Sequence, residues 1–390
     1  MSKEHIIGID LGTYAIKIVI ADPSQLTSKK KPRIIHSLEY PSHGFRNGYV
    51  VDQGRAFESF KSAIKKAELE YKQPITRARF SISGVGLKSQ YVRTSIEITK
   101  KNNEIDEAHT EEVTQKAEEL FASKYPNKKI LHAIPVQYRV DDKDVLGTPI
   151  GMYGTRLEIK IIFITIPEHH LDALVSLIEK NNIAITDVLA GPLADAAAIL
   201  SYQQKNQGSV IINIGSETTS FSTFKNGIIT SLEILPLGSN DITNDLALGL
   251  QIPLEKAESI KKGAHHDLPK KRVEDIIYAR IADILELADK HLLQMNKHRL
   301  FPAGILFTGG GSYTKDLNEY TRQMMKLPSE EIKITQTSQK NKKSTRIPNQ
   351  FSSAYGLCND EKSSYRGSQR SFSLKKIKTF FSKIFRQLMP

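Results

Sequence analysis

Three short segments of the chain carry residues that could bind phosphate or a nucleotide. In the first, GIDLGT at 8–13, Asp10, Gly12 and Thr13 follow an apolar run. Glycines let a backbone approach phosphate oxygens, and consecutive N–H groups there form an anion-binding nest. A carboxylate beside that nest repels phosphate unless a divalent cation lies between them. We therefore expect Asp10 to hold Mg²⁺ through water and Lys17 to reach a phosphate as a point charge.

The other two segments repeat the pattern of an apolar run followed by a polar loop that contains glycine. In NIGSETT the candidate groups belong to Asn213, Gly215, Ser216, Thr218 and Thr219. In GILFTGGGS they belong to Gly309, Gly310, Gly311 and Ser312, whose backbone could lie flat against a purine and a ribose. Glycine turns occur in ordinary hairpins too, so the order and spacing of the three segments carry more weight than any one of them.

The segments that position these loops alternate between strand and helix patterns. Residues 5–20 and 209–230 both predict strand, glycine turn and strand, and the second ends at an Asn226-Gly227 turn. Two such units indicate two related halves. Helical spacing of apolar residues marks 55–71, 168–181 and 239–299, a strand-rich segment runs from 80 to 166, and polar composition predicts loop and linker at 335–350 and 358–371.

Composition excludes several classes of protein. The chain has 390 residues, 39% of them hydrophobic, so it can bury substantial cores and is neither collagen-like, a coiled coil nor wholly disordered. Its single cysteine, Cys358, cannot form an internal disulfide. This favours a reducing compartment and excludes a cysteine-built zinc site; we expect an inert thiol. The N-terminal MSKEHIIGID does not resemble a signal peptide, and no apolar run reaches the roughly 18 residues of a membrane span.

Most of the formal net charge of +12 is concentrated at the C-terminus, where residues 340–390 include twelve basic and two acidic side chains. If 372–389 is a helix, its large apolar side chains fall within an arc of roughly 140° and basic side chains occupy the opposite side. The apolar residues are Leu374, Ile377, Phe380, Phe381, Ile384, Phe385 and Leu388, and the basic ones are Lys375, Lys376, Lys383 and Arg386. This pattern predicts an amphipathic helix that binds anionic lipid reversibly. Docking on the protein's own body and binding of nucleic acid are the alternatives, and the continuous apolar stripe favours lipid.

The three loops, with a helical insert between the second and third, resemble the nucleotide-binding motifs of the actin-like ATPase superfamily. Two longer stretches are more specific. LPLGSNDITNDLALGLQIPLEKAESIKKGA at 235–264 is similar to subdomain 2B of the FtsA family of bacterial cell-division proteins, and IPVQYRVDD with PIGMYGTRLEIKIIFIT, within 134–166, resembles the 1C subdomain of that family. The resemblance extends nearly end to end. It implies an α/β, two-lobed, actin-like (ribonuclease-H-like) fold with an FtsA-type 1C subdomain and a C-terminal amphipathic helix.

The resemblance also implies a division of the chain into subdomains. These are 1A at 1–84 and 167–200, an SHS2-like 1C at 85–166, 2A at 201–236 and 302–357, 2B at 237–301, a linker at 358–371 and the membrane-targeting helix at 372–389.

By the same resemblance, the chain binds ATP with Mg²⁺, and Glu258, Lys261 and Lys262 border the adenine and ribose. The implied function is that of a division protein that polymerises with itself on the cytoplasmic face of the cell membrane at the division site. There it would bind anionic lipids and other division proteins, but no nucleic acid, and tether FtsZ. The FtsZ C-terminal peptide would dock on the helical region 272–300, where Arg280 and Asn296 are the candidate contacts, both expected to be exposed.

Two positions depart from the catalytic pattern of the superfamily. Asn213 stands where an Asp usually opens the second loop, and an amide has no negative charge for a cation and cannot take a proton. Gly191, in LAGPLADAAAIL, stands where relatives orient water with Gln or Glu, and Asp195 lies one helical turn further on. In addition, Glu217 is expected to bring a carboxylate close to the phosphates. Loss of one such catalytic group costs on the order of 10² to 10³ in rate, so we expect ATP binding with weak or no hydrolysis. An active ATPase or phosphotransferase, and a scaffold similar to the pilus-assembly protein PilM, remain the alternatives.

Overall fold

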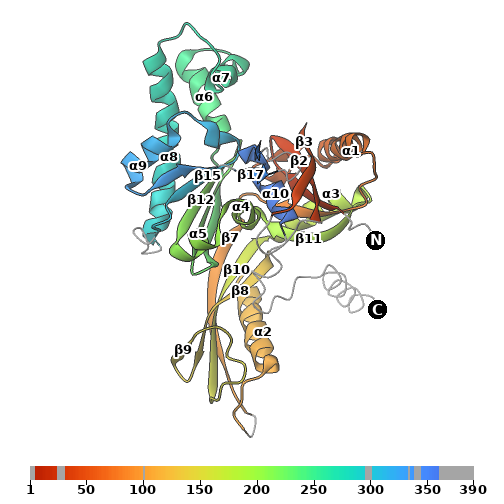
Figure 1. The fold of residues 1–390 in the computed structure, drawn as a ribbon, viewed down its shortest axis with the longest axis vertical. Coiled ribbons are helices and arrows are strands. Elements are labelled where there is room, and N and C mark those ends of the chain that lie inside the picture. The colour runs from red at the N-terminus through yellow and green to blue at the C-terminus, as the bar shows by residue number, and fades with distance from the viewer. Residues whose placement is uncertain are drawn as a thin grey trace. The chain divides into compact units, whose positions relative to one another are not determined.

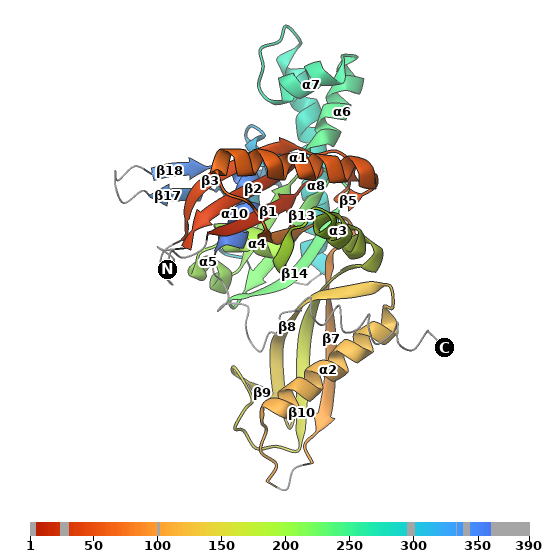
Figure 2. The same cartoon turned by 90° about the vertical axis from the view of Figure 1, so that its right-hand side faces the viewer.

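The structure is a computed structural model that describes residues 5–23, 31–99, 102–294, 301–332, 334–337 and 344–359. The described residues form two compact units (Figures 1 and 2). Unit 1 contains those up to Leu87 and from Ala173 onward, and unit 2 those from Lys88 to Asp172. The amphipathic helix predicted at 372–389, the linker beyond Asn359 and the candidate contact Asn296 lie outside the described residues.

The first lobe of unit 1 is built on a sheet with the strand order β11-β6-β1-β2-β3. These strands are β1 (Ile6–Leu11), β2 (Ala15–Asp22), β3 (Arg33–Pro41), β6 (Arg77–Ile82) and β11 (Ala184–Ala190). Branched residues such as Ile9 and Ile18 fill its core. Helix α1 (Gln53–Tyr71), capped by the Asp52 side chain, packs on β2 and β3 (Figure 2), and the short hairpin β4 (Phe45–Arg46) and β5 (Tyr49–Val50) precedes it.

The second lobe of unit 1 has the strand order β16-β15-β12-β13-β14. Its strands are β12 (Ser209–Ile214), β13 (Thr219–Lys225), β14 (Ile228–Leu235), β15 (Ile305–Thr308) and β16 (Ser329–Glu331). Its helices are α5 (Tyr202–Gln207), α6 (Ser239–Leu250), α7 (Leu254–Lys261), α8 (Lys270–Gln294) and α9 (Leu317–Met325), and Figure 1 shows α8 alongside α6 and α9. One apolar core, including Ile212, Leu246, Leu285 and Phe307, joins the sheet to these helices.

The two lobes repeat one arrangement. β1 pairs antiparallel with β2 and parallel with β6, just as β12 pairs antiparallel with β13 and parallel with β15. The predictions of strand, glycine turn and strand are thus confirmed in both lobes. The turn at Asn226 and Gly227 is also present, with φ values of 53° and 80°.

Helices α4 (Gly191–Ile199) and α10 (Ser352–Cys358) pack against each other and are buried along almost their whole lengths. A Cβ on Gly356 would lie 1.8 Å from the Ala194 carbonyl oxygen, and a Cβ on Gly8 would lie 2.2 Å from the Ala354 carbonyl oxygen. Gly8 therefore makes room for α10. Cys358, also on α10, is fully buried, and burial raises the pKa of its thiol to about 12, in keeping with the inert thiol expected.

Unit 2 is a sheet with the order β7-β10-β8-β9, covered on one face by helix α2 (Glu107–Lys124). Its strands are β7 (Lys88–Glu97), β8 (Lys128–Val140), β9 (Lys143–Val145) and β10 (Arg156–Pro167), and the chain returns to unit 1 along α3 (Glu168–Lys180). Val113, Ala117 and Phe121 of α2 pack on Ile159 and Phe163 of β10.

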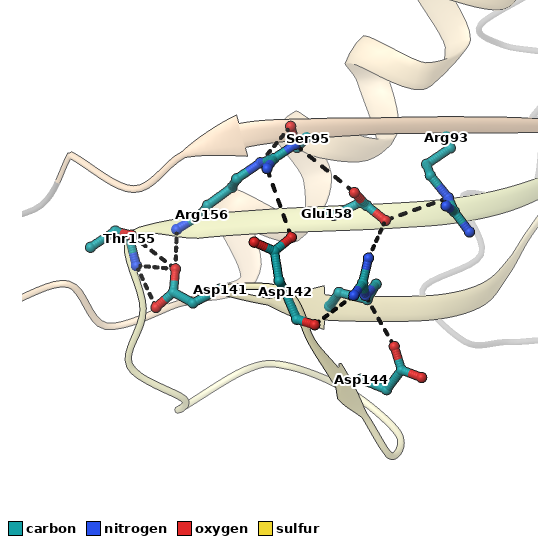
Figure 3. Close-up of polar contacts among 9 residues, drawn as sticks. Arg93, Ser95, Asp141, Asp142, Asp144, Thr155, Arg156 and Glu158 are labelled. Carbon is teal, nitrogen blue, oxygen red and sulfur yellow. Dashed lines mark hydrogen bonds and ion pairs between the residues drawn. The ribbon is translucent and has the colours of Figure 1, made fainter.

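Ionic contacts surround Glu158 on β10 (Figure 3). Its side chain is 14% exposed, and its carboxylate lies 3.4 Å from Arg93, 3.7 Å from Arg139 and 4.0 Å from Arg156. Because side chains alternate along a strand, Glu158 lies on the face opposite Ile159, which packs toward α2. The strand pattern of β10 thus separates an apolar face from a charged one.

One of our predictions of secondary structure was incomplete, and another was wrong. The segment 80–166 contains helix α2 as well as strands, because an apolar stripe spaced by four residues, from Val113 through Ala117 to Phe121, packs on the sheet. The polar stretch 335–350 contains strands β17 (Ile334–Thr337) and β18 (Ser344–Ile347), which pair antiparallel. Buried Ile334 and Ile347, opposite each other in that pair, explain how a mostly polar hairpin is held.

Candidate functional site

The first loop joins β1 to β2, and their register places Asp10 opposite Lys17. The Lys17 ammonium lies 3.6 Å from Asp10 Oδ2, and Ser81 donates a hydrogen bond to Asp10 Oδ1. A Cβ on Gly12 would lie 3.3 Å from the Lys17 ammonium, so that cation stands directly at the loop. Thr13 accepts a hydrogen bond from the Gly48 N–H at 3.0 Å. The loop thus brings together a carboxylate, a cation and a hydroxyl.

The second loop, between β12 and β13, is closed on itself. The Gly215 N–H donates to the Thr218 carbonyl at 2.8 Å, so this predicted phosphate donor is already used within the loop. Thr219 is 1% exposed and donates to the Leu237 carbonyl, so it is not available to a ligand. Ser216 binds the start of α6 through its carbonyl, which accepts from the Asn240 N–H at 2.7 Å.

The carboxylate of Glu217, expected close to the phosphates, binds the backbone of the first lobe. Its Oε2 accepts a hydrogen bond from the backbone N–H of Asn47 at 2.7 Å. Asn47 belongs to the turn of the β4–β5 hairpin in the first lobe, next to Gly48, which binds Thr13. That one turn therefore contacts the first and second loops together.

The third loop follows β15. Gly309, with φ of 81°, passes close to the second loop, because a Cβ there would lie 2.2 Å from Asn213 Oδ1. Gly311 is buried against Ile214. The Ser312 hydroxyl donates to the Gly309 carbonyl at 2.7 Å. The second and third loops are thus in van der Waals contact, and Gly309 is needed for their approach.

The predicted residues Glu258, Lys261 and Lys262, at the end of α7, form one ionic cluster. Glu258 Oε2 lies 2.6 Å from the Lys261 ammonium and accepts from Thr243 at 2.5 Å, and its Oε1 lies 3.1 Å from Lys262. Lys261 also donates to the Ser239 carbonyl at the start of α6, next to the second loop. The Lys262 ammonium lies 5.7 Å from the ring centroid of Tyr14 in the first loop, which places this cluster beside both loops.

Glu258 and Lys261 each change the pKa of the other. Burial acts to raise the pKa of Glu258, but hydrogen bonds from Lys261 and Thr243 and the charge of Lys261 outweigh it and bring that pKa to about 2. Burial lowers the pKa of Lys261 even though Glu258 opposes the change. Both pKa values are thus lowered, as expected for an ion pair in which the Lys261 ammonium, 13% exposed, is more deeply buried than the Glu258 carboxylate, 30% exposed.

Asp195 is the residue that sequence reasoning left aside. It is fully buried on α4, and its Oδ2 accepts a hydrogen bond from Asn213 Nδ2 at 2.7 Å. Its Oδ1 accepts from the hydroxyls of Ser352 and Ser353, at 2.6 and 2.7 Å. The available signal was one acidic residue inside the otherwise small and apolar run LAGPLADAAAIL.

The position expected to orient water is occupied by Gly191, at the start of α4. A Cβ there would lie 2.0 Å from the Ser83 hydroxyl oxygen, so a longer side chain has no room unless Ser83 moves. The structure thus leaves this position without a side chain that could act as a base.

Arg280 of α8 is half-buried rather than exposed. Its guanidinium donates to both carboxylate oxygens of Asp245 on α6, at 2.7 and 3.0 Å, and lies 3.1 Å from Asp283. It therefore joins two helices of the second lobe.

A surface pocket of about 480 Å³ lies between β3 and α1. Its lining residues include Tyr40, His43 and Arg55, and none of them belongs to the three loops.

Within the described residues, no group of three or more His, Cys, Asp or Glu side chains is arranged to hold a metal ion. The donors at the first loop do suit Mg²⁺ bound with a nucleotide, because that ion usually takes one or two carboxylates together with waters and phosphates. The carboxylate of this loop is that of Asp10, which is 13% exposed and lies beside the Lys17 ammonium. In the described parts of the chain, no helix is both long and apolar enough to cross a bilayer.

Comparison with known proteins agrees with this geometry. A family model described as "Cell division protein FtsA" matches residues 210–356, and one described as "SHS2 domain inserted in FTSA" matches residues 84–165. The cell division protein FtsA of Bacillus subtilis is 30% identical over 333 residues, which cover 79% of this chain and 74% of the relative. The chain belongs to the FtsA family. FtsA of Borreliella burgdorferi is 27% identical over 414 residues, covering 99% of this chain and 96% of that one.

Solved structures show that this chain has the actin-like fold. The PilM-PilN type IV pilus biogenesis complex matches with a TM-score of 0.64 at 14% identity, covering 90% of this chain and 97% of that one. MreB5 of Spiroplasma citri bound to ADP matches with a TM-score of 0.54 at 12% identity, covering 93% and 97%. At these identities the likeness shows the fold alone. The family matches therefore favour an FtsA-type cell-division protein over the PilM-like scaffold that the sequence left open.

Proposed function

We propose that the chain binds MgATP at the three loops and acts as the actin-like division protein that polymerises and tethers FtsZ to the membrane. The observation that supports nucleotide binding is the convergence of the loops. Asn213 touches Gly309, the 47–48 turn contacts Thr13 and Glu217, and Lys262 lies over Tyr14. Asp10 would hold the ion through water, and Lys17 and the third loop would contact the phosphates and the adenosine.

Equilibrium titration with MgATP tests this assignment. Lys17→Met should weaken binding about tenfold, because it removes a cation at the loop while keeping the length of the side chain. Lys65→Met, on the exposed side of α1, removes the same charge away from the loops and should leave affinity unchanged. Equal affinities for the native chain and Lys17→Met would contradict the assignment of Lys17.

Hydrolysis is proposed to be weak. Asn213 has no charge to offer the ion, and Gly191 has no side chain with which to orient water. Phosphate release should therefore fall well below about 1 s⁻¹, the lower end of ordinary turnover. A rate at or above that value, with or without a candidate acceptor, would support the alternative of an active ATPase or phosphotransferase.

Membrane attachment is proposed for residues 372–389, which lie outside the described residues, on the strength of their sequence pattern alone. Flotation of the full chain with vesicles that contain anionic lipid should be lost when 372–390 are deleted, and should be weaker on neutral vesicles. A truncated chain that floats as well as the full chain would rule this attachment out.

Binding of the FtsZ C-terminal peptide is proposed for the region 272–300. A pull-down with that peptide should retain the native chain and lose the Asn296→Ala variant. Arg280→Ala needs its unfolding temperature measured as well, because this arginine also joins α6 to α8 through Asp245. Retention of both variants at native levels would contradict docking of the peptide at Arg280 and Asn296.

A further inference from the structure

A hydrogen-bonded network centred on Asp195 joins the second and third loops to the helices α4 and α10. Besides Asn213, Ser352 and Ser353, it includes Thr308, which ends β15 and donates to the Ser352 hydroxyl at 2.9 Å. Residues from α4, α10 and both loops of the second lobe thus depend on one buried carboxylate. Such a network is costly to leave half-satisfied, so its members hold one another in place.

The network determines which way the Asn213 amide faces. A carboxylate accepts hydrogen bonds and cannot donate them, so the group of Asn213 that meets Asp195 Oδ2 at 2.7 Å has to be its NH₂. The carbonyl oxygen Oδ1 is then turned toward Gly309 of the third loop. Without the acceptor at 195, either orientation of the amide would be open.

Asp195 is also held without a cation among the donors named above. The hydroxyls of Ser352 and Ser353 and the amide of Asn213 are all neutral. Asp10, the other carboxylate of the site, is close enough to act on Asp195 electrostatically and to disfavour its charge. A further carboxylate beside Asp195 would therefore meet strong repulsion.

We propose that Asp195 is the positioning residue of the nucleotide site, which it orients through Asn213 while tying the second loop to α10 through Ser352 and Ser353. The inference rests on the proposed binding of MgATP. If Asp195 acts in this way, the carboxylate at 195 and the amide at 213 can be exchanged between the two positions. Either position accepts the carboxylate, provided that the other supplies an NH₂ group.

The reciprocal exchange tests this pairing in the full chain. Asn213→Asp alone places two carboxylates at hydrogen-bonding distance, and should weaken MgATP binding at least tenfold near neutral pH and lower the unfolding temperature. Adding Asp195→Asn restores the hydrogen bond between positions 195 and 213 with donor and acceptor reversed, while the amide oxygen at 195 still accepts from Ser352 and Ser353. We expect the double variant to bind MgATP within about threefold of the native chain. Asp275→Asn, on the exposed side of α8, is the matched charge control.

The outcomes separate this inference from the proposed function. A native chain that does not bind MgATP overturns the proposed function, and this inference with it. Native binding together with an Asn213→Asp variant that binds equally well overturns the inference alone, as does a double variant no better than that single one. If Asn213→Asp fails to fold, a folded double variant that binds MgATP supports the pairing, and a double variant that also fails to fold overturns it.

Discussion

The backbone N–H of Asn47 donates a 2.7 Å hydrogen bond to the carboxylate of Glu217, which joins the hairpin turn of the first lobe to the second loop of the second. A hydrogen bond with one charged partner is worth about 1.5–3 kcal/mol when it is partly sheltered. Glu217 thus provides a contact between the lobes that its sequence position did not predict.

Replacing Glu217 should release this turn. We expect hydrogen exchange of the Asn47 amide to quicken about tenfold in Glu217→Ala, because that variant removes the acceptor, and less in Glu217→Gln, which keeps a neutral one. Glu255→Ala on the exposed side of α7 is the control and should leave Asn47 unaffected. Unaltered protection of Asn47 in Glu217→Ala would mean that the contact contributes nothing in solution.

The crossing of α4 and α10 should tolerate no side chain at Gly356. In Gly356→Ala the added Cβ meets the Ala194 carbonyl oxygen at 1.8 Å, so one helix must move, at a cost of about 3 kcal/mol in the free energy of unfolding. Gly54→Ala, in the first turn of α1, meets its nearest atom at 3.5 Å and should be neutral or stabilising by about 0.5 kcal/mol. Urea unfolding of the two variants compares them, and equal stability would refute the close approach of the helices.

Asp195 should make stability depend on pH. Burial, with the nearby charge of Asp10, raises the pKa of this carboxyl to about 6 against the opposing hydrogen bonds, so between about pH 4 and 6 the native chain keeps a proton that the unfolded chain has lost. The contribution of Asp195 to the free energy of unfolding is therefore largest near pH 4 and falls as the pH rises from about 4 to 6.

The Asp195→Asn variant isolates the effect, since an amide does not titrate. The unfolding free energy of the native chain minus that of Asp195→Asn should fall by about 2 kcal/mol between roughly pH 4.5 and pH 7.5. Denaturant unfolding at both pH values measures it. A difference that stays constant, or grows toward pH 7.5, would contradict the raised pKa.

Lys261→Met should disrupt the cluster on α6 and α7. It leaves the partly buried Glu258 with Thr243 and Lys262 but without its nearest cation, and we expect a loss of about 1–2 kcal/mol in stability together with weaker MgATP binding. Lys256→Met, exposed on the same helix, removes an equal charge as the control. In the native chain the pKa of Glu258, about 2, keeps its carboxylate charged, and because Lys261 is a main cause of that low pKa, the variants are compared at neutral pH. Two variants of equal stability and affinity would contradict a role for the pair.

Strand and turn predictions succeeded where local patterns suffice. The runs before Asp10 and before Asn213 are rich in Ile and Val and end in glycine turns, which favours strands in almost any context. Helix α2 was missed because its narrow stripe, Val113 to Phe121, gains stability mainly from the sheet it covers. The hairpin of β17 and β18 was missed for a similar reason, since two buried isoleucines hold an otherwise polar segment.

The loop residues, the family and the related halves follow from amino-acid order, because strand patterns and glycine turns are short-range features of a chain. The role of Asp195 does not, since it depends on Asn213, Ser352 and Ser353, brought to it by the packing of α10 on α4. Glu217 likewise meets Asn47, 170 positions away, only after both lobes have folded. Hydrogen bonds at such separations leave no periodic pattern in a sequence, so only the folded structure shows which buried or loop residue a polar side chain contacts.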